Sequence, residues 1–101
     1  MKLIIVTAVE QFLKDVLNIF KKANIENFSS FEIDGYKNKP ELLKASNWFS
    51  GEKGSNESSL FFSFTDEEHI DALFQIIEDF NNNIETNNLI RAIVLPIERF
   101  I

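Results

Sequence analysis

The sequence predicts an α+β fold in which a four-stranded antiparallel sheet carries two helices on one face. Two amphipathic helices are each flanked by apolar strands, so the chain follows the order β-α-β, loop, β-α-β. A long polar segment, residues 37–59, forms the loop between the second and third strands. With 101 residues, the chain, residues 1–101, is expected to form a single domain. Split β-α-β units of this kind adopt the ferredoxin-like βαββαβ arrangement.

The first half of the chain contains the pattern of a strand, a helix and a second strand. Residues 2–9 are dense in isoleucine, valine and leucine, which is typical of a strand buried on both faces. From Glu10 the apolar residues recur at helical spacing, and Asn24 is a suitable C-terminal stop. From Ser29 to Asp34 apolar and polar residues alternate, which indicates a half-exposed strand.

The second half repeats this order of elements. Residues 60–64 predict the third strand. Thr65 and Glu68 have the spacing of a capping box, in which the threonine would be the N-cap of the following helix. This second amphipathic helix is expected to stop at the three asparagines 81–83, and residues 90–95 predict the last strand.

The phenylalanines predict a second apolar surface on the sheet. The chain contains 11 of them, and five lie in or next to the second and third strands of the chain: Phe28, Phe31, Phe61, Phe62 and Phe64. These five are too many for the face that the helices cover, so some of them must point away from the helices. A bare apolar sheet face predicts a protein partner, most simply further copies of the same chain.

Composition excludes several classes of function. A net charge of −6 argues against non-specific binding to nucleic acid and to anionic membrane surfaces. The absence of cysteine excludes disulfides, thiol catalysis and cysteine metal sites. The apolar run at the N-terminus is too short for a signal peptide, and no segment approaches the length of a membrane span. We therefore expect a cytoplasmic protein that does not insert into a membrane.

Aromatic and basic residues in the long loop suggest contacts beyond the chain. Trp48 and Phe49 either fold back onto the sheet or an adjacent subunit, or form an exposed anchor for a partner protein. The loop also carries lysines within an acidic protein. These lysines are either simply solvated or contact an anion, and in the second case Lys37, Lys39 and Arg91 would converge at a subunit cleft.

No catalytic or metal-binding constellation is present in the sequence. It contains no P-loop, HExxH or GxSxG motif and no Ser-His-Asp set. As a metal ligand, the single histidine, His69, would need help from Asp66, Glu67 or a neighbouring subunit. Capping and the helix dipole account for the acidic residues 66–68. We therefore expect a protein that is not an enzyme and that has no catalytic or metal-binding residues.

Short signatures along nearly the whole chain resemble the PII signalling proteins: MKLIIVTA, FEIDGYKNK, LFFSFTDEEHIDALFQIIEDF and AIVLPIE. The segment NWFSGEKGSNESSLFFSFT also resembles the third-strand region of the related CutA proteins, which share the trimeric fold. The PII resemblance implies a homotrimer that binds adenine nucleotides in clefts between subunits and docks its long loop onto a transporter or an enzyme. The CutA alternative implies a trimer involved in divalent metal tolerance.

The PII resemblance also implies a set of candidate ligand-binding residues: Gly35, Tyr36, Lys37, Lys39 and Arg91. Gly35 and Tyr36 match the start of the family's G-F-G-x-Q-K segment. Lys37 stands where the second glycine is expected, and Lys39 where the glutamine is expected. The glycine-rich turn before the last strand and the terminal arginine pair have no counterpart, and Arg91 alone corresponds to the basic residue that closes the turn. Glycine matters there because backbone amides must approach phosphate closely.

The sequence therefore predicts a PII-like trimeric sensor or regulator. It would bind a small ligand, with an adenine nucleotide as the implied cofactor, at subunit clefts and a target protein through residues 37–59. Ligand-linked ordering of that loop would be the regulatory step. The alternatives are a CutA-like trimer and a structural trimer or adaptor that binds no small ligand.

Overall fold

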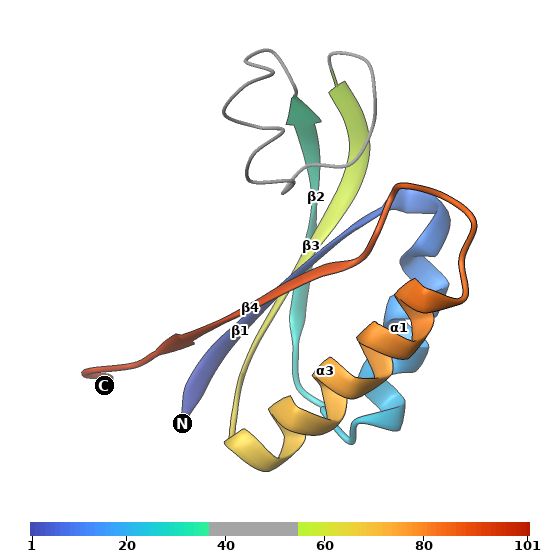
Figure 1. Ribbon diagram of the computed structural model, residues 1–101. Helices are drawn as coiled ribbons and strands as arrows, with labels where there is room; N and C mark the ends of the chain where they lie inside the picture. Colours follow the sequence, from blue (N-terminus) through green and yellow to red (C-terminus); the bar gives the residue numbers. More distant parts are fainter. Residues whose placement is uncertain (37–54) are drawn as a thin grey trace.

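The computed structural model describes residues 1–36 and 55–101, which form one twisted sheet with two helices against it (Figure 1). The elements follow one another as β1 (Lys2–Val9), a 3-10 turn η1 (Glu10–Phe12), α1 (Leu13–Lys22), β2 (Ser29–Tyr36), β3 (Ser55–Thr65), α3 (Glu67–Asn82) and β4 (Arg91–Pro96). None of the helices in the described residues is long and apolar enough to cross a bilayer.

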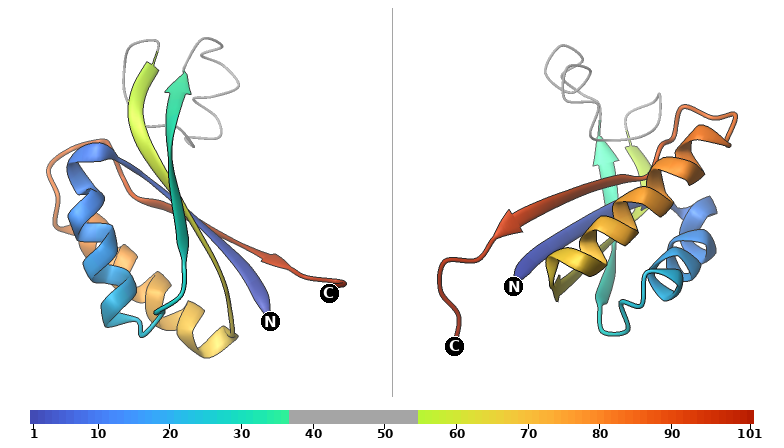
Figure 2. Two further views of the ribbon diagram at one scale, coloured as in Figure 1. Left: turned by 180° about the vertical axis from the view of Figure 1, so that it is seen from behind. Right: turned by 60° about the horizontal axis from the view of Figure 1, so that its bottom comes forward.

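The strand order in the sheet is β2-β3-β1-β4, and every neighbouring pair is antiparallel. Helices α1 and α3 lie on the same face of the sheet in both views of Figure 2 and contact one another. The predicted ferredoxin-like α+β fold is thus confirmed. β2 and β4 are the two edge strands, so the outer sides of these strands carry backbone groups that can pair with another chain.

The hydrophobic core lies between the helices and the sheet face that they cover. Phe20 of α1 and Phe61 of β3 are fully buried there, with ring centroids 5.7 Å apart. Phe28 packs edge-on against Phe20, and Phe12 packs in the same way against Phe80 of α3. Such aromatic pairs add to the burial of a large apolar area, which the small domain needs.

The third strand begins earlier than the sequence predicts. β3 starts at Ser55, so residues 55–59 are not part of the loop, and the predicted loop boundary at residue 59 is wrong. These residues show no apolar alternation, but they pair with β2 up to Tyr36, so that every residue of β2 has a partner in β3. Ser58 and Ser59 are buried between β2 and β1, where small side chains fit.

The helix ends are set by local hydrogen bonds. Asn24 ends α1 in the left-handed conformation, with φ of 59°, and its amide donates to the Lys21 carbonyl, as predicted for a C-terminal stop. The predicted cap of the second helix is wrong by one residue. Thr65 remains in β3 opposite Lys2, so Asp66 is the N-cap of α3 and accepts from the His69 amide at 3.1 Å.

Candidate functional site

The root of the long loop is formed by the ends of β2 and β3. Gly35 and Tyr36 are the last two residues of β2, and their backbones pair with Asn56 and Ser55 of β3. The other candidate residues of the loop lie outside the described residues: Lys37, Lys39, Trp48 and Phe49. The structure therefore shows where the loop leaves the sheet, at the far end of the β2–β3 hairpin from α3 (Figure 1).

Arg91 lies at the opposite edge of the sheet. It is the first residue of β4, is half-buried, and stands directly opposite Thr7 of β1. Paired residues of antiparallel strands point to the same face. The register continues this row through Leu60 to Phe31 of β2, so Arg91 lies on the helix-free face.

Within a single chain, Gly35 and Arg91 therefore lie far apart. From β2 to β4 the sheet spans three strand spacings, about 14 Å, and Gly35 is displaced further along its strand. One small group, such as a phosphate, therefore cannot contact both Gly35 and Arg91 within a single chain.

The helix-free face of the sheet is largely apolar. Phe31 and Phe64 are 51% and 57% exposed, and Ile93 and Leu95 of β4 are 37% and 41% exposed. Leu3 of β1 is only half-buried, so β1 is not covered on both faces within one chain, contrary to the expectation from its composition. The prediction that some of the phenylalanines point away from the helices is confirmed.

The apolar character of this face is graded along the strands. Towards the start of β1, the rows contain Phe64 opposite Leu3 and Phe62 opposite Ile5. Towards the loop root, the next row contains Arg91 and Thr7 beside the apolar Leu60 and Phe31. The first two rows are suited to a dry contact with another chain, whereas the β4 end of the third row is polar.

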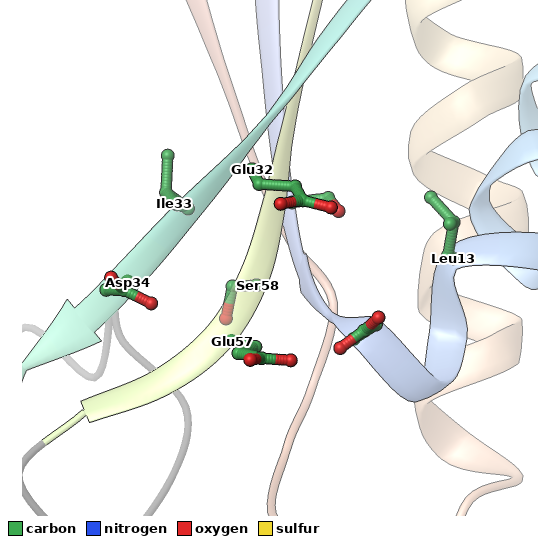
Figure 3. A pocket seen from close by; sticks show the side chains of 8 residues that line it. Leu13, Glu32, Ile33, Asp34, Glu57 and Ser58 are labelled. Atoms are coloured by element: carbon green, nitrogen blue, oxygen red, sulfur yellow. The ribbon is translucent and has the colours of Figure 1, made fainter.

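An acidic cavity of about 520 Å³ lies on the other face, beside the loop root (Figure 3). Its carboxylates come from β2, β3 and η1: Glu10, Glu32, Asp34 and Glu57. In Figure 3 the Glu32 and Glu57 side chains extend from neighbouring strands toward the side on which Leu13 lies. The sequence analysis missed this cluster, because only the fold places Glu10 beside β3. The alternation of Glu32 and Asp34 on one side of β2 was the available signal.

The carboxyl groups that line this cavity repel one another. Glu57 stands directly opposite Asp34, and like charges in opposed positions destabilise a sheet. A hydrogen bond with the Glu10 carboxyl, and then charge repulsion from it, raise the pKa of Glu57. None of the described residues that line this cavity is basic. This cavity is therefore unfavourable for a phosphate group.

His69 forms a local pair with the cap of α3. Its Nδ1 atom lies 2.6 Å from Asp66 Oδ1, and this hydrogen bond, together with that from the His69 amide, lowers the pKa of Asp66. The pair stabilises a helix end. Within residues 1–36 and 55–101 no group of three or more histidine or acidic side chains is close enough to hold a metal ion.

Comparison with known proteins shows similarity at the level of fold. The structure matches that of CPII, a nitrogen regulatory PII-like protein from Thiomonas intermedia K12, which was solved bound to ADP, AMP and bicarbonate. The match has a TM-score of 0.62 at 11% sequence identity, and it covers 99% of this chain and 94% of that protein. No protein-family model matches the sequence, and no curated protein is significantly similar to it. The chain thus has a PII-like fold.

Proposed function

We propose that the protein is a non-catalytic, PII-like regulator that acts as a cytoplasmic homotrimer. It binds an adenine nucleotide in the clefts between subunits and contacts a target protein, such as a membrane transporter or an enzyme, through residues 37–54. The observation that carries this proposal is the PII-like fold over nearly the whole chain, together with the nucleotides bound to its structural neighbour.

The exposed sheet face supports the homotrimer. Phe31, Phe64, Ile93 and Leu95 are each more than one third exposed and share the helix-free face. A contiguous apolar face of this kind marks a protein contact, because leaving it in water forfeits about 25 cal/mol per Å² of apolar surface. Further copies of the same chain present the same rows and satisfy the contact by symmetry.

The placement of the candidate residues supports a ligand site between subunits. Gly35 and Arg91 lie on opposite edge strands, so a site that uses both residues is complete only in an assembly. Arg91 supplies a permanent positive charge with several donors for a phosphate group. The acidic cavity lies on the other face of the sheet, so its carboxylates are not beside the position where Arg91 would hold a phosphate group.

The long segment that follows β2, residues 37–54, provides the proposed contact with the target. Trp48 and Phe49 are the aromatic anchors that we assign to this contact, because large aromatic side chains dominate many protein interfaces. Ligand in the cleft at the root of the segment would favour those conformations of the segment that the target binds. The size of the effect equals the ligand's difference in affinity for the two sets of conformations.

Light scattering and calorimetry on the full chain test the proposal. We expect the mass of three copies at micromolar concentration, and heats of binding for ADP or AMP. Arg91→Ala should weaken nucleotide binding about tenfold, by loss of one charge-assisted hydrogen bond, and should leave the mass unchanged. A folded single chain of 11.7 kDa would overturn the trimer. The absence of any heat of binding for ATP, ADP and AMP would overturn the nucleotide site. No observation favours the CutA-like alternative.

A further inference from the structure

The Asn81 side chain makes two hydrogen bonds to the backbone of one distant residue. Its Nδ2 atom donates to the Ile90 carbonyl at 2.9 Å, and its Oδ1 atom accepts from the Ile90 amide at 2.9 Å. A side-chain amide offers a donor and an acceptor side by side, so it can replace the backbone of a missing neighbouring strand. Asn81 lies near the end of α3, and Ile90 is the residue that precedes β4.

These two hydrogen bonds, here called the Ile90 clamp, fix the end of the connector between α3 and β4, residues 83–90. Ile90 is only 2% exposed, so its amide and carbonyl groups need protein partners. The pairing of β4 with β1 reaches Arg91 but not Ile90, and Asn81 provides the missing partners. Within the connector, the Asn88 amide donates to the Thr86 hydroxyl at 3.0 Å. The position of the chain at the start of β4 is therefore fixed by the hydrogen bonds of Asn81 at Ile90 and by the pairing of Thr7 with Arg91.

Arg91 is the residue next to the clamp. Its position on the helix-free face depends on the register of Thr7 with Arg91, and that register begins at the residue after Ile90. In this chain the family's glycine-rich turn is absent from the connector. The β-carbons beside its backbone amides hinder their close approach to phosphate, so in the proposed site the direction of Arg91 has a larger effect on an anion.

We infer that Asn81 is a positioning residue, which holds Arg91 in place for the phosphate of a nucleotide bound at the subunit cleft. This inference rests on the proposed function. With the clamp intact, Arg91 is oriented before the ligand arrives. Without it, part of the binding free energy is used to order the start of β4.

Asn83 provides a matched control two residues further along the chain. Its Nδ2 atom donates to the Asp79 carbonyl at 2.7 Å, within the last turn of α3. Asn83→Ala thus removes an asparagine hydrogen bond at the same helix end and leaves the Ile90 clamp intact. A general loosening of this helix end would affect both variants alike, whereas a role through Arg91 would affect Asn81→Ala alone.

A double-mutant cycle tests the inference. Titrations with ADP compare the full-length wild type with Asn81→Ala, Arg91→Ala, the double variant and Asn83→Ala. Asn81→Ala should raise the Kd about fivefold, the cost of ordering one long side chain. Because Asn81 acts through Arg91, the double variant should bind no more weakly than Arg91→Ala alone. Asn83→Ala should bind like the wild type.

The outcomes separate this inference from the proposed function. If the wild type binds ADP but the effects of Asn81→Ala and Arg91→Ala simply multiply, or Asn83→Ala binds equally weakly, the positioning role is wrong and the proposed function stands. If the wild type binds no nucleotide, both are wrong. Circular dichroism confirms folding of each variant, and Asn81→Gln, which keeps the amide on a longer stem, replaces Asn81→Ala in the cycle if the alanine variant does not fold.

Discussion

Phe31 of β2 and Phe62 of β3 meet on the helix-free face of the sheet, with ring centroids 6.4 Å apart and planes at 68°. They are diagonal neighbours, since Phe31 stands directly opposite Leu60. Phe62 also contacts Phe64 edge-on at 6.2 Å, so three rings form a continuous row across two strands. Phe31 and Phe64 are more than half exposed in one chain. The row is therefore organised before any partner covers it.

The first prediction concerns this row. Phe64→Asp should shift the mass in solution from three copies towards one, because a carboxylate placed in the contact would lose its water without gaining a partner. The exposure of Phe64 in the single chain means that the fold itself should tolerate the change. Light scattering at micromolar concentration measures the mass, and circular dichroism measures the fold.

Leu17 is the matched control for Phe64. It is an apolar residue of α1 that is 41% exposed, and it lies on the helical layer, away from the bare sheet face. Leu17→Asp should leave the mass unchanged. An equal loss of mass in both variants would show that charge as such, and not the sheet face, drives the change.

The second prediction concerns the acidic cavity beside the loop root. The pKa of Glu57 is raised above its ordinary value of 4.5 in the folded chain, chiefly by a hydrogen bond with Glu10. The folded state therefore binds this proton more tightly than the unfolded state, and stability falls as the pH rises through the folded pKa. Glu57→Gln should raise the Tm at pH 7, and the gain should vanish well below pH 4.5.

Salt provides the control for the Glu57 prediction. The carboxyl groups are exposed, so their repulsion is screened at high ionic strength. The gain from Glu57→Gln at pH 7 should therefore shrink in 1 M salt, where the Debye length is about 3 Å. A gain that is independent of both pH and salt would instead indicate improved packing or strand propensity.

The third prediction concerns the cap of α3. Asp66→Ala removes the acceptor of the His69 amide and should lower the Tm by about 5 °C, the typical effect of a lost N-cap in a domain of this size. Asp66→Asn keeps an acceptor and should lower it less. Thermal unfolding followed by circular dichroism measures both. Thr65→Ala should not reproduce the loss, since Thr65 is not the cap.

The same cap predicts a pH dependence of opposite sign to that of Glu57. Hydrogen bonds from the side chain and amide of His69 lower the pKa of Asp66 below its ordinary value of 3.8. Its contribution to stability is therefore present above 3.8 and is lost as the pH falls through the folded value. The difference in Tm between the wild type and Asp66→Ala should narrow on acidification. A constant difference down to pH 2 would contradict this assignment.

The sequence by itself determined the elements and their order. Residues 2–9 were predicted as a strand with the bounds that β1 has, and Asn24 was predicted as the stop of α1, because period and end signals are local properties of the chain. The split of the phenylalanines between two faces also followed from strand alternation and their number. These features need no knowledge of what lies opposite each residue.

Only the tertiary structure decided which residues meet. Residues 55–59 are a strand because β2 lies opposite them, although their composition is that of a loop. Glu10, Glu32, Asp34 and Glu57 gather because three elements far apart in sequence converge at the loop root. The strand order places Gly35 and Arg91, two of the candidate ligand-binding residues, on opposite edge strands. Pairing between strands is non-local, and sequence periodicity reports only the environment of each residue, not its partner.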